Sequence, residues 1–452
     1  MIRPLAASFA LCLAAPFAPL AAQIPPPEES GGESAGETSI STAMEAAGNG
    51  IVAVLRGERP AEEVFAPSFL AVVPEAQLQA MMQQLTSQFG ALHGLEAATG
   101  TGDGGGVIAL RFEKAIARGP VQLDAEGQVA GMRLNQFDPI DDGADKILAD
   151  LAAFPGRTGV YYASLDGDGG DGDDPILTAD ADRQFAIGST FKLYVLSALA
   201  HQVASGERSW DEVVRLDIRS LPSGISQDWP QGAPVTLHTL ATLMISISDN
   251  TATDQLIAIV GRDAIAEELR ASGHSAPDGT LPLLNTLELF GLKGDLQHGL
   301  AYAAAGEEEQ ARMLDAFSTE IAGDPDRIIK PTFTRPTAID SLEWFASGRD
   351  LASLMQRIVA LEDPTARRIM AINPALPEGQ RADWQYIGYK GGSEPGVLNL
   401  TWLLQDKAEH WRILTLSWNN PDAPVDASAL ELIAQRILAL DDAGLALARR
   451  TP

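Results

Sequence analysis

Apolar residues change their spacing several times along the chain, and each change predicts a different kind of element. At first they recur at helical spacing in three ranges, 44–55, 61–73 and 75–89. The spacing then becomes that of strands in three further ranges, 107–112, 119–123 and 129–134. Helices followed by short strands predict a small α+β domain, to which we assign residues 41–138.

A second domain begins after the segment 137–143, where Asp141–Asp142–Gly143 interrupts the regular pattern. We assign residues 144–442 to this domain. Its apolar spacing predicts helices over 146–154, 193–200, 237–247, 251–260, 264–272 and 427–440. Strands are predicted over 158–164, 184–187, 384–389, 398–404 and 412–418. This mixture of elements indicates an α/β (α+β) fold.

The N-terminus has the pattern of a secretory signal peptide over residues 1–22, with Arg3 before an apolar stretch and Ala21–Ala22 at its end. The only cysteine, Cys12, lies inside this segment, so the mature chain would contain none. That excludes disulfides, a cysteine nucleophile and cysteine-bound zinc. We expect an exported, periplasmic or secreted protein in which residues 23–40 form a flexible linker rich in proline, glutamate, serine and glycine.

The charge balance is strongly acidic, with a formal net charge of −29. Such a chain repels nucleic acid and anionic membrane surfaces, so we expect neither as a partner. No later stretch is long and apolar enough to predict a transmembrane helix. The sequence leaves the oligomeric state open.

An acidic loop over residues 166–174 alternates aspartate and glycine, as calcium-binding loops do. Counted from Asp166, the fifth, sixth and twelfth positions of an EF-hand loop would be Gly170, Asp171 and Leu177. An EF-hand needs an acid or amide, a glycine and a glutamate there, so the pattern fails. We predict a solvated hairpin tip, and expect no metal and no cofactor.

The segment Gly188–Ser189–Thr190–Phe191–Lys192 places a hydroxyl three residues before a lysine. The predicted strand before it and the apolar helix after it would put Ser189 at a helix N-terminus, where free N–H groups face it. Lys192 would lie one turn later on the same helix face. A hydroxyl, a base within reach and oxyanion donors are what serine acylation requires. Taken alone, the pattern is more typical of an N-cap serine followed by a solvated lysine.

Two further motifs follow in chain order. Ser248–Asp249–Asn250 lies at the corner between two predicted helices, from which its polar side chains can point into a cleft. Lys390–Gly391–Gly392–Ser393 follows one predicted strand and precedes another. Together with Ser189 and Lys192, they form the ordered trio of motifs found in class A β-lactamases and penicillin-binding proteins.

Residues 145–440 therefore resemble the serine β-lactamase family, class A type. The resemblance implies an antiparallel sheet flanked by a helical subdomain. More residues separate Ser248 from Lys390 than in compact members of the family, which implies an insertion within residues 301–335. The preceding small domain is similar in pattern to the nuclear-transport-factor-like, or cystatin-like, domains.

Chemistry suggests a role for each candidate residue. Ser189 is the predicted nucleophile, and a desolvated Lys192 beside another cation could take its proton. Ser248 could relay a proton towards a leaving nitrogen. Asn250 could hold both Lys192 and a substrate amide, and Lys390 could attract a substrate carboxylate while lowering the pKa of Lys192.

The family resemblance further implies an oxyanion hole made by the backbone N–H groups of Ser189 and Ser393. The predicted site comprises the catalytic residues Ser189, Lys192 and Ser248 and the substrate-binding residues Asn250, Lys390, Gly392 and Ser393.

The sequence departs from the family pattern at two places. Gly391 lacks the hydroxyl usual between the lysine and glycine of the third motif, and we expect Ser393 to supply one instead. The glutamate that activates water for deacylation would align with Leu281, in a segment ending Leu284–Asn285. An alternative alignment shortens this loop, and it lacks the glutamate too. Glu288 is the nearest acid, but its surroundings predict a helix.

Three functions are therefore compatible with the sequence. The first is a serine hydrolase acting on small-molecule β-lactams or related amides and esters, with esterase activity kept open. The second is a penicillin-recognising peptidase of the cell wall, which shares all three motifs. The third is a sensor that traps β-lactams as long-lived adducts, which the absence of the glutamate favours.

Overall fold

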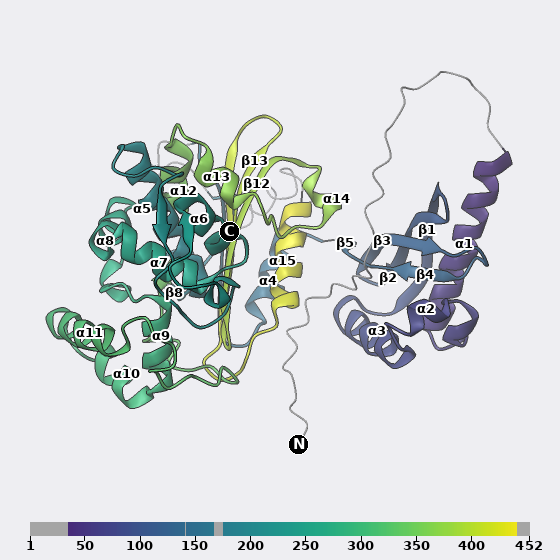
Figure 1. Cartoon of the computed structure of the whole chain (residues 1–452). Helices are drawn as coiled ribbons and strands as arrows, with labels where there is room; N and C mark the ends of the chain where they lie inside the picture. The colour runs from purple at the N-terminus through teal and green to yellow at the C-terminus, as the bar shows by residue number, and fades with distance from the viewer. Residues whose placement is uncertain (1–34, 141, 167–174, 441–452) are drawn as a thin grey trace. The chain divides into compact units, whose positions relative to one another are not determined.

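A computed structural model describes residues 35–140, 142–166 and 175–440 (Figure 1). The chain divides into two compact units between Asp142 and Gly143. The predicted signal peptide, most of the predicted linker and most of the acidic loop lie outside the described residues. No helix in the described ranges is both long and apolar enough to cross a membrane.

The first unit packs helices against one face of an antiparallel sheet. Its helices are α1 (Ala35–Leu55), η1 (Ala61–Glu63), α2 (Pro67–Leu70) and α3 (Glu75–Phe89). Its strands are β1 (Leu92–Gly102), β2 (Gly105–Phe112), β3 (Ala115–Leu123), β4 (Val129–Met132) and β5 (Gln136–Pro139). Strands β1 to β4 follow their sequence order across the sheet, and β5 also pairs with β3.

Two sequence predictions for this unit need correction. The helix expected over 61–73 is broken, because Pro67 begins α2 and the residue before a proline avoids helical backbone angles. Strand β1 was missed because its glycine-rich sequence lacks apolar alternation. The structure also places a strand, β5, at the start of the predicted boundary segment 137–143, where β5 pairs with β3 and Asp138 forms an ion pair with Arg118 at 2.6 Å.

The larger unit is built on a second antiparallel sheet, with the strand order β12-β13-β14-β6-β7. These strands are β6 (Arg157–Ser164), β7 (Leu177–Ala179), β12 (Trp384–Glu394), β13 (Val397–Asp406) and β14 (Trp411–Asn419). Two small two-stranded sheets pair β8 (Phe185–Ala186) with β11 (Phe345–Ala346) and β9 (Val213–Arg215) with β10 (Pro234–Thr236).

Helices cover both faces of this sheet. One face packs against α4 (Ala144–Ala152) and α15 (Ala427–Ala439), which lie side by side (Figure 1). The other face carries the helical region: η2 (Gly188–Phe191), α5 (Lys192–Ala204), η3 (Ser226–Asp228), α6 (Leu237–Ser246), α7 (Asn250–Val260), α8 (Arg262–Ala271), η4 (Pro277–Gly279), α9 (Thr286–Gly294), α10 (Leu296–Ala303), α11 (Glu307–Ile321), α12 (Gly348–Ala360) and α13 (Thr365–Met370). The short helix α14 (Glu378–Arg381) lies beside α15, where the Gln380 side chain donates to the Gln435 carbonyl.

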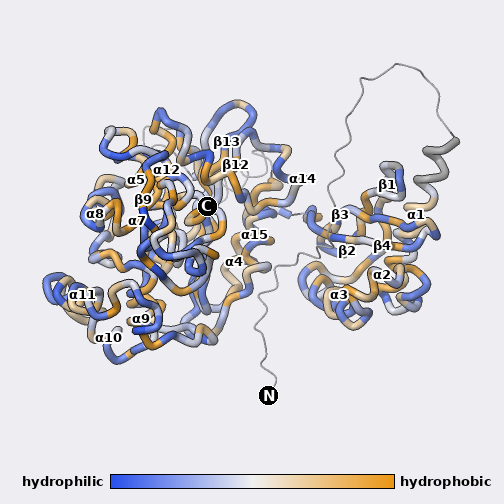
Figure 2. The backbone as a smooth tube through the Cα atoms, viewed as in Figure 1, coloured by the Kyte–Doolittle hydropathy of each residue, from blue (hydrophilic) through white to orange (hydrophobic). Residues whose placement is uncertain are grey.

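Alternation along the central strands explains why both faces are covered. In β14, Leu414 and Leu416 belong to the core beneath α15, whereas Ile413 points into the core around α5. A strand buried on both faces is usually mostly apolar, and residues 397–404 of β13 are all buried although Asn399 and Thr401 interrupt their apolar sequence. Figure 2 shows hydrophobic residues, in orange, along α15 beside this sheet. The predicted α/β architecture of this domain, an antiparallel sheet with a helical region, is confirmed.

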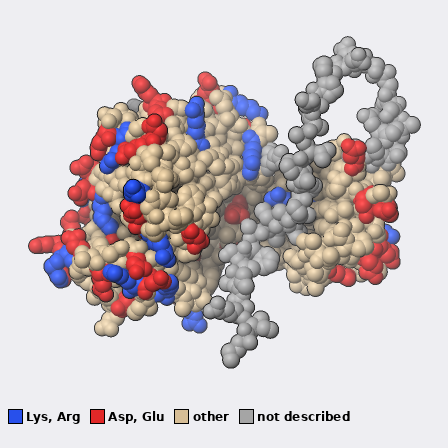
Figure 3. Space-filling model, viewed as in Figure 1, with Lys and Arg blue, Asp and Glu red and all other residues tan. Residues whose placement is uncertain are grey.

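Charge is distributed rather than concentrated on the visible face of the larger unit. Figure 3 shows acidic and basic side chains interspersed over the outer helices there. The net negative charge of the chain is therefore not gathered into one patch on that face.

The core of the first unit yields a test of its packing. Phe112 is fully buried at the end of β2, whereas Val107 on the same strand is 43% exposed. We expect Phe112→Ala to lower the free energy of unfolding by about 3–5 kcal/mol, because it leaves a cavity. The matched substitution Val107→Ala should cost less than about 1 kcal/mol. Urea denaturation of the full chain measures both, and equal losses would contradict the observed packing.

Candidate active site

The turn that carries Ser189 is held by backbone contacts on both sides. Ile187 N donates to the Trp344 carbonyl at 2.9 Å, and the Asn419 side chain bonds both the N–H and the carbonyl of Ala186. After this short strand, Gly188 adopts a positive φ of 48° and η2 begins. The turn is therefore fixed to β11 and to the end of β14 before Ser189 is reached.

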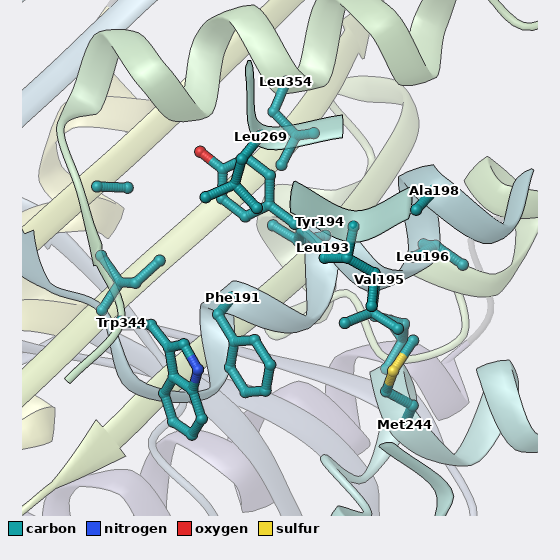
Figure 4. Close-up of a cluster of buried hydrophobic side chains, with 14 of the residues drawn as sticks. Phe191, Leu193, Tyr194, Val195, Leu196, Ala198, Met244, Leu269, Trp344 and Leu354 are labelled. Atoms are coloured by element: carbon teal, nitrogen blue, oxygen red, sulfur yellow. The ribbon is translucent and has the colours of Figure 1, made fainter. Parts of the chain in front are cut away.

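Apolar packing fixes the other end of η2. The Phe191 ring stacks on the Trp344 ring, with a centroid distance of 3.7 Å and an interplanar angle of 9° (Figure 4). Helix α5 follows, and its residues from Lys192 to Ala200 are all buried. The predicted apolar helix is thus present, although the strand predicted over 184–187 is reduced to the two residues of β8.

Lys192 is fully buried at the start of α5 and donates hydrogen bonds to the second motif. Its Nζ lies 2.7 Å from Asn250 Oδ1, 3.0 Å from Ser248 Oγ and 2.7 Å from the Ser248 carbonyl. Within the described residues, no hydrogen bond joins Lys192 to the half-buried Ser189 hydroxyl. The structure therefore places Lys192 one helical turn from Ser189 and in contact with Ser248 and Asn250.

The corner between α6 and α7 presents Ser248 to the site. Helix α6 ends at Ser246, Ser248 has a positive φ of 57°, and Asp249 caps α7 by accepting from Ala252 N. The buried Asp249 carboxylate also accepts from Ile225 N and from the N–H and hydroxyl of Ser226. The loop before α6 is thereby tied to this corner.

Asp249 stands in the second motif, but the motif alone does not indicate a role for it. Its place directly before a predicted helix was the available signal, because aspartate is a preferred N-cap. The structure shows that it holds the corner in shape, so Ser248 and Asn250 can face Lys192.

Lys390 reaches the same corner from the sheet. Its Nζ lies 3.1 Å from Ser248 Oγ and 2.5 Å from the Gly391 carbonyl. The Ser248 hydroxyl therefore lies between two buried lysines that come from different elements: Lys192 from α5 and Lys390 from β12. The sequence placed the third motif after a strand, whereas β12 in fact continues through it to Glu394.

Gly392 allows β12 to lie directly against η2. A Cβ at this position would lie 2.0 Å from the Ile187 carbonyl oxygen, 2.5 Å from Ser189 N and 2.7 Å from Thr190 N, so no side chain fits. A Cβ on Gly188 would lie 3.2 Å from Ser393 N. The backbone nitrogens of Ser189 and Ser393 therefore border the same contact between strand and turn. Ser393 itself is exposed.

Burial changes the protonation of both lysines. Desolvation, followed by the positive charge of Lys390, lowers the pKa of Lys192 well below its ordinary value. The negative charges of Asp254 and Asp249 oppose this effect. Desolvation lowers the pKa of Lys390 to about 7. Burial therefore favours the neutral form of each lysine, and a proton acceptor at such a site must be neutral.

The segment aligned with the deacylation loop is apolar where the family glutamate is expected. Leu281 is buried. Glu288 is fully occupied elsewhere: it closes the capping box of α9 with Asn285, pairs with Arg262 at 2.5 Å and accepts from Ser318 Oγ. Its carboxylate is thus held at the start of α9 by three partners.

Asp254 was also missed by the sequence reasoning. It is buried on α7 and accepts from Thr286 N at 2.8 Å, from the Thr286 hydroxyl and from Leu287 N. Desolvation raises its pKa to about 6, although these hydrogen bonds act in the opposite direction. The signal was its spacing four residues after Asn250, on the same helix face. Among the described residues, no group of three or more His, Cys, Asp or Glu side chains could hold a metal ion.

Comparison with known proteins relates the chain to one enzyme family. The model of the beta-lactamase enzyme family matches residues 143–372, which include Ser189, Lys192, Ser248 and Asn250. No curated protein matches the chain.

Solved structures similar to the chain come from β-lactamases and a protein named PBP-A. A β-lactamase from Sphaerobacter thermophilus is 24% identical, with a TM-score of 0.45, over 67% of this chain and 96% of that one. PBP-A is 19% identical, with a TM-score of 0.44, over 68% and 96%. A β-lactamase from Francisella tularensis is 14% identical, with a TM-score of 0.46, over 65% and 96%.

Proposed function

Because this chain belongs to the beta-lactamase enzyme family, we propose that it is a serine hydrolase in which Ser189 attacks β-lactams or related amides and esters. The observation that carries this proposal is the convergence of Lys192 and Lys390 on the Ser248 hydroxyl, beside the turn that bears Ser189. We further propose that the protein is exported, on the pattern of residues 1–22.

In the proposed acylation, the Ser189 oxygen attacks the substrate carbonyl carbon while neutral Lys192 takes the hydroxyl proton. The N–H groups of Ser189 and Ser393 stabilise the negative oxygen that forms. Ser248 then passes a proton to the leaving nitrogen as the carbon–nitrogen bond breaks, and receives one from Lys192. Their hydrogen bond of 3.0 Å supports this transfer.

Substrate binding is proposed for the remaining residues of the site. Protonated Lys390 attracts a substrate carboxylate, and the Asn250 amide, already held by Lys192 and the Leu221 carbonyl, orients a substrate amide group. Gly392 contributes by its small size, which keeps Ser393 N beside Ser189 N. The exposed Ser393 hydroxyl takes the place of the hydroxyl that Gly391 lacks.

A second candidate is a protein that binds β-lactams and releases the acyl group slowly. Buried Leu281, at the position expected for the water-activating glutamate, and the occupied carboxylate of Glu288 favour this candidate. A general base contributes about 10²–10⁴-fold to such a step, so its absence would prolong the adduct.

Intact-mass measurement after mixing with a penicillin tests the proposed function. We expect a covalent adduct on the wild-type protein and none on Ser189→Ala. Lys192→Ala should form it at least about a hundredfold more slowly, because the proton acceptor is lost. Circular dichroism checks that both variants are folded. A wild-type protein that forms no adduct and turns over no acyl substrate would sink the proposal.

The lifetime of the adduct distinguishes the two candidates and tests the role of Leu281. Rapid loss of the wild-type adduct supports the hydrolase, and a persistent adduct supports the second candidate. We expect Leu281→Glu to shorten the lifetime by about a hundredfold, because a carboxylate can then activate water. Leu281→Gln is the matched control, since glutamine has nearly the same shape as glutamate but cannot accept the proton. Equal lifetimes in the Glu and Gln variants would reject this position for the base.

The low pKa of Lys390 predicts an alkaline fall in acylation. Above its pKa of about 7 the neutral amine no longer attracts a carboxylate, so labelling by a penicillin should decline as pH rises through that value. A penicillin ester, which has no carboxylate, should keep its rate to higher pH. Lys390→Arg, which stays charged, should remove the decline. Stopped-time mass spectrometry across this range measures each profile, and identical profiles for acid and ester would argue against the role.

A further inference from the structure

A buried lysine and two glutamates join three separate segments of the larger unit. Lys293 Nζ, in the last turn of α9, lies 2.5 Å from Glu343 Oε1 and 2.5 Å from Glu394 Oε1. The side chains of Lys293 and Glu343 are fully buried, and that of Glu394 is 12% exposed. We call these three residues the Lys293 cluster. Burying three such groups is costly, so the cluster differs in kind from a surface ion pair.

The cluster does not belong to the predicted site, yet two of its residues lie close to the site along the chain. Glu394 directly follows Ser393 and lies on the same face of β12 as Gly392, two residues earlier. Glu343 directly precedes Trp344, whose carbonyl accepts from Ile187 N and whose ring stacks on Phe191. The cluster therefore connects α9 to both sides of the contact between β12 and η2.

The end of β12 needs such an anchor for a physical reason. β12 is the edge strand of its sheet, pairing only with β13 among the strands of the described sheet. The last residues of β12 include Gly391 and Gly392, and glycine weakens a strand because its backbone loses more conformational freedom on folding. Gly392 cannot be replaced by a stiffer residue, because η2 lies against it. The side chain of Glu394 is the first after this pair that is held by buried ionic contacts.

We propose that Lys293 and Glu394 are positioning residues that hold the Ser393 N–H in place beside the Ser189 N–H. This proposal rests on the acyl-serine function proposed above. Lys293 anchors the end of β12 to α9, and Glu343 holds the lysine from the opposite side. Neither Lys293 nor Glu394 takes a proton or touches the substrate.

Glu394→Met is the most direct test. It leaves the ion pair of Lys293 and Glu343 intact, with no net charge, and removes only the contact that holds β12. We expect the limiting rate of acylation by a penicillin to fall about tenfold, a part of what the loss of a whole oxyanion donor costs. The concentration for half-maximal rate should change less than about threefold, because the groups proposed to bind the ground-state substrate remain. Glu394→Gln, which still offers Lys293 an oxygen, should recover most of the rate.

Arg436→Met is the matched control. Arg436 is a buried cation of the same unit that pairs with Asp150 at 2.7 Å and joins α15 to α4. The Arg436→Met substitution should lower the melting temperature without changing the acylation rate. A Glu394→Met protein that acylates at the wild-type rate would overturn the proposal, as would equal rate losses in the two variants.

Hydrogen exchange tests the anchor without relying on any activity. Peptides that cover residues 391–396 should exchange faster in Glu394→Met than in the wild type, and at the wild-type rate in Arg436→Met. If the wild type forms no adduct, the proposed function fails, and the exchange result alone decides whether Glu394 holds the strand. Unchanged exchange would overturn the anchor. If Glu394→Met does not fold, Glu394→Asp, which is too short to reach Lys293, replaces it in both measurements.

Discussion

The close contact between the backbones of β12 and η2 is the constraint on which the rest of the site depends. It requires a residue without a side chain at position 392, since a Cβ there would overlap the Ile187 carbonyl. It also requires η2 to be held firmly, which Trp344 and Asn419 achieve from opposite sides. The amide nitrogens of Ser189 and Ser393 are brought together by this contact, which side-chain packing alone could not produce.

The electrostatics of the site follow from what its charged groups bond. Lys192 and Lys390 donate to neutral oxygens of Ser248, Asn250 and Gly391 within the described structure. The nearby carboxylates are engaged elsewhere: Asp249 by the N-terminus of α7 and Asp254 by that of α9. Within the described residues, no carboxylate forms an ion pair with either lysine, which suits a site that receives an anion.

Much of the fold could be predicted from residue patterns. The helices beginning at Glu75, Leu237 and Asn250, and the three strands β12 to β14, follow from apolar spacing and capping residues, because these signals are local. The edge strands β1 and β5 could not be predicted in this way. Their stability comes from pairing with distant strands and not from their own composition.

The sequence by itself determined which residue types are available and in what order, so three short motifs identified the family and the candidate residues from Ser189 to Ser393. Only the tertiary structure decided their neighbours. It placed the Ser248 hydroxyl between two lysines, assigned Glu288 to a helix cap and buried Lys293 beside Glu394. Hydrogen bonds and burial act between residues far apart in the chain, and local patterns do not encode those distances.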